Sequence, residues 1–113
     1  EGLVQIFEAV MENKPFIMNV YHALSREQIE NYLFRLTRDL IMNVIKECSK
    51  GMNITASEQS FIADFYKYSF VGLMLDWIKK GMKENYHEIA NDICITMNGN
   101  IKNSLQNFAD SKK

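Results

Sequence analysis

The chain has 113 residues, with 13 basic and 14 acidic side chains and a formal net charge of −1. This length suits one domain, and 47% hydrophobic residues are enough for a real core. The balanced charge excludes broad attraction to polyanions, so this chain alone is not expected to bind nucleic acid. The longest apolar run, residues 70–75, is much shorter than the roughly 20 residues of a membrane span, so we expect no membrane contact.

The apolar spacing predicts an all-α chain of five helices, because no segment alternates with the period of a strand. The first helix covers residues 3–12, and the second covers residues 15–24 with Pro15 in its first turn. The third covers residues 26–49 and begins at the capping-box pattern Ser25–Gln28. Its apolar residues form a single stripe, so we expect it to bury one side only.

The last two predicted helices have clear end signals. The fourth covers residues 56–80, begins at a second capping box in Thr55–Glu58, and ends where Gly81 suits the left-handed position. The fifth covers residues 86–108 behind an Asn85 cap. Gly99 lies inside this fifth pattern and marks either a kink or a close helix contact.

The fourth helix is apolar on nearly every side. At about 100° per residue, Phe61, Phe65 and Gly72 share one direction, and the polar residues form no continuous face. Such a helix must be covered all round. A compact chain of this length has a radius of gyration of only about 13 Å, and its other helices can cover one side. We therefore expect a second copy of the chain to cover the other, which makes the protein a homodimer.

Residues that carry chemistry do not point to an enzyme. Cys48 and Cys94 are too few for a disulfide framework or a zinc site, which favours buried free thiols in a cytoplasmic protein. His22 and His87 lack metal-ligand spacing, and we interpret His22 as a helix-end or pocket-lining group. No nucleophile has an identifiable partner and no glycine-rich phosphate loop is present. We expect neither a metal nor a cofactor.

Aromatic side chains suggest a cavity between the third and fourth helices. An apolar cavity with few polar groups is typical of a ligand site, although core packing is the favoured explanation for any one aromatic residue. The predicted pocket consists of Tyr21, Tyr32, Tyr66, Phe70 and Trp77.

Residues 65–82, FYKYSFVGLMLDWIKKGM, resemble the penultimate helix of TetR/AcrR-type transcriptional regulators. In that helix an aromatic-rich stretch leads to Gly-Leu, then to Trp and an aliphatic residue, and then to a basic end and Gly-Met. Residues 83–90 resemble the capped start of the family's last helix, with Asn85-Tyr86 where many members have Ser-Pro. Residues 6–16 resemble its junction of helix, Glu-Asn, basic residue and second helix. Within the family the likeness is nearest to dihydroxyacetone-kinase-type regulators.

The resemblance implies that residues 1–113 form an all-α effector-binding and dimerisation domain. The last two helices would pair with those of a second subunit in a four-helix bundle. It also implies an N-terminal helix-turn-helix domain that reads operator DNA, which would lie upstream of this chain. The expected dimer contacts are Tyr68, Gly72, Leu75, Ile93, Met97, Asn100, Ile101 and Ser104.

Three hypotheses follow. In the first, a small apolar or aromatic effector, or a partner protein, binds among the first four helices and moves the first helix relative to the dimer bundle. In the second, the chain is a helical protein-interaction module without a small-molecule ligand. A deep cavity favours the first hypothesis and a filled core favours the second. The third, a small helical enzyme, has no nominated catalytic residue.

Overall fold

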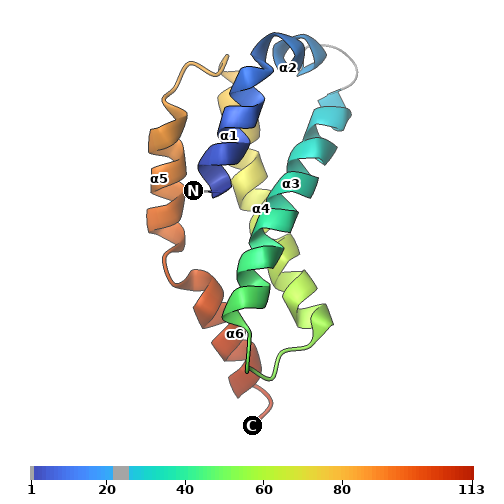
Figure 1. Cartoon of the computed structure of the whole chain (residues 1–113), viewed down its shortest axis with the longest axis vertical. Coiled ribbons are helices and arrows are strands. Elements are labelled where there is room, and N and C mark those ends of the chain that lie inside the picture. Colours follow the sequence, from blue (N-terminus) through green and yellow to red (C-terminus); the bar gives the residue numbers. More distant parts are fainter. Residues whose placement is uncertain (1, 22–25) are drawn as a thin grey trace.

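The computed structural model describes residues 2–21 and 26–113, except for the side chains of residues 20 and 21. Within these residues the chain is helical and has no strand, so the all-α prediction is confirmed (Figure 1). No helix among the described residues has both the length and the apolar character needed to cross a membrane. The helices are α1 (Gly2–Glu12), α2 (Lys14–Tyr21), α3 (Arg26–Cys48), α4 (Ala56–Lys79), α5 (Tyr86–Met97) and α6 (Asn100–Asp110).

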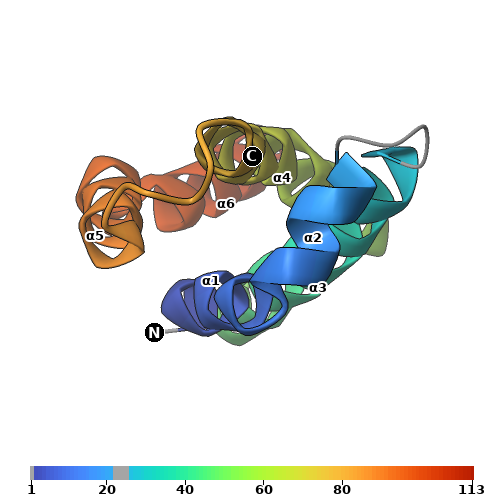
Figure 2. The ribbon, with the colours of Figure 1, turned by 90° about the horizontal axis from the view of Figure 1, so that it is seen from above.

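The helices form two layers. Seen from above, α5, α6 and α4 lie in one row, and α1, α2 and α3 lie in the other (Figure 2). The Cα atoms extend over 51 × 27 × 17 Å and have a radius of gyration of 15.6 Å. A compact domain of this length has a radius of about 13 Å. The chain is therefore longer and flatter than a self-contained globule, and it leaves more helix surface uncovered.

The ends of α4 confirm the predicted signals. The hydroxyl of Thr55 accepts a hydrogen bond from the backbone N–H of Glu58, and the Glu58 carboxylate accepts one from the N–H of Thr55. At the other end Gly81 has φ of 86°, and the N–H of Met82 donates to the carbonyl of Trp77 over 3.0 Å. The capping box begins α4 and the turn at Gly81 ends it, where the sequence predicts.

The predicted fifth helix is present, but it is bent and forms two segments. Residues 98 and 99 divide it into α5 and α6, and Gly99 takes the left-handed conformation with φ of 80°. A Cβ atom built at Gly99 would meet nothing within 4 Å. Of the two readings left open, the glycine makes a kink, and no close helix contact within this chain requires it.

The core joins the two layers around Trp77. Phe7 of α1 is fully buried and packs edge-on against the Trp77 ring, with 5.1 Å between centroids. Tyr86 of α5 lies 5.9 Å from both rings. The Trp77 indole N–H donates to the carbonyl of Glu84 over 3.0 Å. The side chain therefore ties α4 to α1 and to the start of α5.

Some predictions lie outside the described residues. These are the end of the second helix after Tyr21, the first residue of the capping box at Ser25, the pocket side chain of Tyr21, and the assignment of His22 to a helix end or pocket. Of the two cysteines, Cys48 is half-buried and Cys94 is exposed, so the expectation that both are buried is wrong for Cys94. Both thiols are free, as predicted.

Candidate functional site

One side of α4 carries large apolar side chains that the chain itself does not cover. Phe61, Phe65 and Tyr68 are 62%, 62% and 61% exposed. On a helix with about 100° per residue they share an arc with Gly72 and the half-buried Leu75. We call this set (Phe61, Phe65, Tyr68, Gly72, Leu75) the α4 stripe. An exposed apolar patch of this kind is typical of an interaction site.

Gly72 lies between Tyr68 and Leu75 in the α4 stripe. A Cβ atom built there would meet nothing within 4 Å, so the fold of this chain does not require a glycine at this point. A glycine in a helix interior costs about 1 kcal/mol relative to alanine. A glycine at such a point would let another helix approach closely, which is consistent with an interaction site on this side of α4.

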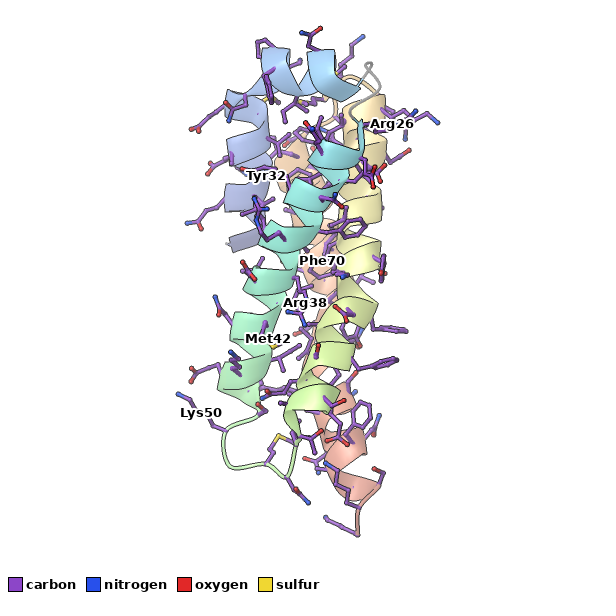
Figure 3. All side chains as sticks on the ribbon, turned by 90° about the vertical axis from the view of Figure 1, so that its right-hand side faces the viewer. Arg26, Tyr32, Arg38, Met42, Lys50 and Phe70 are labelled. Carbon is purple, nitrogen blue, oxygen red and sulfur yellow. The ribbon has the colours of Figure 1, made fainter. Side chains whose placement is uncertain are left out.

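The exposed aromatics of α4 are held in place by their neighbours. The Tyr68 ring lies edge-on to Phe34 of α3, with 5.3 Å between centroids. The ammonium of Lys67 lies 5.1 Å from the Tyr68 centroid and 5.6 Å from that of Phe34. Phe61 and Phe65 lie 6.5 Å apart. The stripe is thus a preformed surface, beside the α3–α4 contact that Figure 3 shows.

An ion pair ties α3 to α4 next to the stripe. Arg38 donates to the Asp64 carboxylate over 2.9 Å and to the Ser60 hydroxyl over 2.6 Å. Lys67 lies 3.2 Å from the same carboxylate. The hydrogen bond from Arg38 is the main cause that lowers the pKa of Asp64 below its ordinary value. The Asp64 side chain is 45% exposed, so solvent screens this pair.

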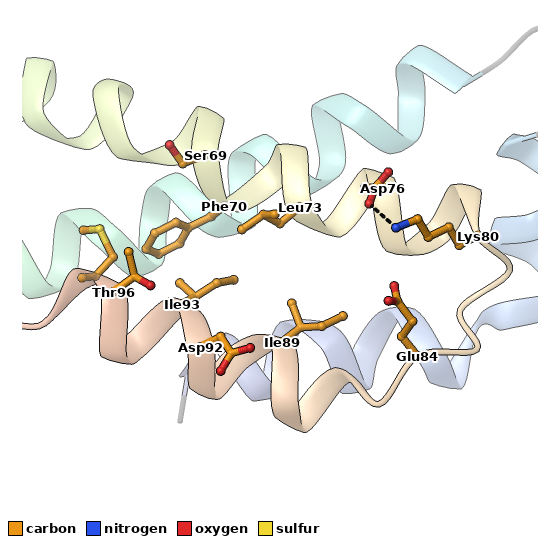
Figure 4. Close-up of a pocket in the computed structure, with 11 residues that line it drawn as sticks. Ser69, Phe70, Leu73, Asp76, Lys80, Glu84, Ile89, Asp92, Ile93 and Thr96 are labelled. Carbon is orange, nitrogen blue, oxygen red and sulfur yellow. Dashed lines mark ion pairs between the residues drawn. The ribbon is translucent and has the colours of Figure 1, made fainter.

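A groove of about 390 Å³ separates α4 from α5. Its floor is apolar, with Phe70 and Leu73 from α4 facing Ile89 and Ile93 from α5 (Figure 4). Its rim is charged and includes Asp76, Lys80, Glu84 and Asp92. The Asp76 carboxylate lies 3.0 Å from the Lys80 ammonium and raises the pKa of that lysine. The two helices that form the groove, α4 and α5, lie in the same layer (Figure 2).

The predicted dimer contacts outside α4 lie along α5 and α6, with mixed exposure. Ile93 is only 6% exposed and belongs to this chain's own core. Met97, Asn100 and Ile101 are half-buried. The hydroxyl of Ser104 bonds the Tyr66 hydroxyl over 2.9 Å. Among exposed apolar side chains, Phe61, Phe65 and Ile95 were not in the predicted set, although the helical spacing places the first two beside Gly72.

The described side chains of the predicted pocket lie in different places. Tyr32 lines a cavity on the α1–α2–α3 side, and Phe70 lines the groove between α4 and α5. Tyr66 is bonded to Ser104, and Trp77 is a core residue at 1% exposure. Figure 3 shows Tyr32 and Phe70 on separate helices.

A second cavity lies where α1, α2 and α3 meet. It has a volume of about 330 Å³, and one of the residues that line it, Phe16, is 65% exposed. Of the residues that line this cavity, the sequence analysis assigned only Tyr32 to a pocket. The sequence analysis found the break between the first two helices, but it did not infer that this break brings Ala9 and Phe16 into the wall of one cavity. The cavity is lined by Ala9, Val10, Asn13, Phe16, Ile17, Gln28, Ile29 and Tyr32.

Across residues 2–21 and 26–113, no cluster of His, Cys, Asp and Glu side chains could hold a metal ion. The carboxyl groups with a shifted pKa belong to surface pairs and helix caps. The hydrogen bond from Lys112 is the main cause that lowers the pKa of Glu58, and those from Gln106 and Lys113 lower that of Asp110. These hydrogen bonds stabilise the N-terminal end of α4 and the C-terminal end of α6.

The chain matches a family model described as the C-terminal region of transcriptional regulators, over residues 1–99. It belongs to this TetR-type family of regulator C-terminal domains, as the resemblance predicted. No curated protein and no solved structure gave a significant match. The nearer likeness to dihydroxyacetone-kinase-type regulators stays a prediction.

Proposed function

We propose that residues 1–113 are the signal-receiving and dimerisation domain of a TetR-like transcriptional regulator. Two copies join through α4, α5 and α6, and each copy connects through α1 to a helix-turn-helix domain encoded upstream of Glu1. Operator DNA is bound only by that domain. The chain works in the cytoplasm, where such a regulator meets DNA, and it performs no catalysis.

The observation that carries the proposal is the uncovered α4 stripe. Phe61, Phe65 and Tyr68 each expose more than half of their surface, on a helix whose opposite side packs into the core. The flat shape of the chain leaves this layer open along its length. A second copy placed face to face would cover both stripes at once, because a two-fold interface uses the same patch on each subunit.

The signal would pass through α1. This helix contacts α5 and α3, and its Phe7 packs on Trp77 of α4. A ligand that binds one position of α1 better than another shifts the populations of the two positions. Since α1 lies at the N-terminal end of the chain, a change in its position would alter the separation of two DNA-reading domains.

A second candidate function is a protein-interaction module without a small-molecule ligand. The observation in its favour is that Tyr66 and Trp77, two of the predicted pocket residues, are occupied by internal contacts with Ser104 and Phe7. On this alternative the partner protein would replace the effector, and the dimer would be unchanged.

The dimer is tested by introducing a charge into the stripe. We expect sedimentation equilibrium at micromolar concentration to show a dimer for the natural chain and a monomer for Phe65→Lys. Phe16→Lys is the matched control, since Phe16 is equally exposed at 65% but lies on α2, away from the stripe. A monomeric natural chain, or a Phe65→Lys variant that stays dimeric, would refute the proposal. The codons ahead of Glu1 should also encode a helix-turn-helix.

A further inference from the structure

We propose that α6 is an exchangeable segment. It packs on its own chain when the hinge at Gly99 is bent, and on the same site of a second copy of the chain when the hinge straightens. The exchange would add an interlocked contact to the proposed dimer, and it rests on the proposed function only in that two copies must lie close together. α6 lies outside residues 1–99, over which the family model matches.

The bend between α5 and α6 depends on one residue. Gly99 has φ of 80°, in the left-handed region that glycine enters readily and that alanine avoids. A Cβ atom built at Gly99 meets nothing within 4 Å, so packing at this point does not hold the bend. α6 therefore leaves the direction of α5 through a local backbone conformation (Figure 1).

The end of α5 keeps a hydrogen-bond donor whether the hinge is bent or straight. In the bent chain the Asn100 Nδ2 donates to the carbonyl of Thr96 over 3.2 Å. In a continuous helix the backbone N–H of Asn100 would donate to that same carbonyl, four residues back. The N–H of Asn103 already bonds the carbonyl of Gly99 with this spacing, over 2.9 Å. Straightening the hinge therefore leaves the Thr96 carbonyl paired.

The apolar spacing fits a continuous helix across the hinge. Apolar residues follow one another at intervals of four, without a change of phase at Gly99: Ile93, Met97, Ile101 and Leu105. At about 100° per residue, a straight helix would keep these four side chains within an arc of about 120°. A segment built only for the bent form would not need this spacing to continue through the break.

α6 occupies a defined site on its own chain, and Figure 2 shows it crossing from α5 to α4. Leu105, at the middle of α6, is fully buried, and the adjacent Ser104 hydroxyl bonds that of Tyr66 on α4 over 2.9 Å. Just after α6, Lys112 donates to the Glu58 carboxylate at the start of α4 and to a carbonyl of the α3–α4 loop. Apolar and polar contacts thus fix both the middle and the end of the segment.

A second copy is the occupant that this site fits. A straightened α6 would take Leu105 out of the core cluster, and apolar surface left uncovered is costly. The α6 of another copy has the same side chains and would restore the same contacts, and exchange of an identical segment is a low-cost route to a dimer. The bent form should therefore prevail in dilute chains, and the exchanged form should increase with concentration.

The contact between Lys112 and Glu58 reports the exchange directly. A water-soluble carbodiimide activates the Glu58 carboxyl, and the Lys112 amine displaces the activating group to form an amide. Equal amounts of unlabelled chain and chain labelled with heavy nitrogen are unfolded together in urea, refolded at several concentrations and treated with this reagent. Exchanged dimers should give peptides that join Glu58 to Lys112 with mixed labels, whereas chains that keep their own α6 give matched labels. Lys112→Arg keeps the charge but forms no amide, so it identifies the crosslink.

Gly99→Ala should shift the hinge toward the straight form. We expect the ratio of mixed to matched crosslinks to rise by at least about tenfold, because alanine disfavours the left-handed conformation and favours a continuous helix. Gly51→Ala is the matched control, since Gly51 has φ of 79° and equally open surroundings but lies in the α3–α4 loop. It should lower stability without raising the ratio. Circular dichroism shows whether each variant folds; if Gly99→Ala does not, the concentration dependence in the natural chain decides.

Three results would overturn the proposal: matched crosslinks alone, or none, at every concentration of the natural chain; no rise in the ratio for a folded Gly99→Ala; or an equal rise for Gly51→Ala. Sedimentation and crosslinking of Phe65→Lys separate the two proposals. A natural dimer that Phe65→Lys dissociates, with matched crosslinks alone, refutes the exchange and leaves the dimer through the stripe. Mixed crosslinks that persist in Phe65→Lys refute the dimer through the stripe and leave the exchange.

Discussion

Replacing Gly72 by leucine tests whether another helix lies directly on α4. Within one chain the change should be tolerated, because a Cβ at this position meets nothing within 4 Å. It should even stabilise the isolated subunit, by about 0.8 kcal/mol, since leucine has the better helix propensity. In a dimer joined through the α4 stripe, the same side chain would enter the contact twice.

The size of the effect follows from the number of added side chains. Overpacking of a close contact costs about 1–3 kcal/mol per site, so two leucines cost about 2–6 kcal/mol per dimer. At about 1.4 kcal/mol per tenfold change, the dimer should dissociate between about 30-fold and about 10⁴-fold more readily. The subunits themselves should unfold at a higher urea concentration.

Sedimentation equilibrium over a range of concentrations measures the dissociation, and urea unfolding of the dilute chain measures the subunit. Asn43→Leu is the control, because it adds the same side chain to an exposed site on α3, away from the stripe. An unchanged dimer constant for Gly72→Leu would show that no helix approaches this point, and the reasoning from the stripe would then fail.

Two further predictions concern stability. Thr37→Val should raise the free energy of unfolding by about 1–2 kcal/mol in a urea titration, because the Thr37 hydroxyl is buried without a partner among the described residues; a fall would mean that the hydroxyl is bonded. Asp64→Asn should lower the free energy of unfolding at neutral pH by less than about 1 kcal/mol, given the exposure of the pair with Arg38. Since the folded pKa of Asp64 is lowered, its contribution is present above the ordinary value of 3.8 and is lost as pH falls through the folded pKa. Unfolding curves of the two proteins should therefore converge below that value, and a constant difference would contradict the assignment to this ion pair.

Helix ends could be predicted from the sequence because their causes are local. The capping box of Thr55 and Glu58 lies within four residues, and Gly81 ends α4 through its own backbone conformation. The same local reasoning found Gly99 but not its consequence. A glycine inside an apolar pattern fits either a kink or a close contact, and only the surroundings of α5 and α6 decide between them.

The side chains that line a pocket could not be predicted from local sequence in the same way. Tyr66 meets Ser104, which lies 38 residues away, and Trp77 meets Phe7, which is still more remote in sequence. In both pairs the partners lie on helices far apart in the sequence, so which aromatic faces meet depends on the angles between helices, and a single periodic pattern does not contain those angles. The uncovered side of α4 could be inferred because it follows from one helix and the length of the chain.

The position of α1 explains how a small cavity on one layer could influence a dimer contact on the other. Ala9 and Val10 line the cavity, while Phe7 on the same helix packs against Trp77 and Tyr86. Because Phe7 and Trp77 are fully packed, α1 cannot shift by a fraction of an ångström without a new arrangement of these rings. A ligand that bound equally well to both arrangements would change nothing. A ligand at the Asn13 joint would act as a signal only if its contacts with α1 and α2 differed between the two arrangements.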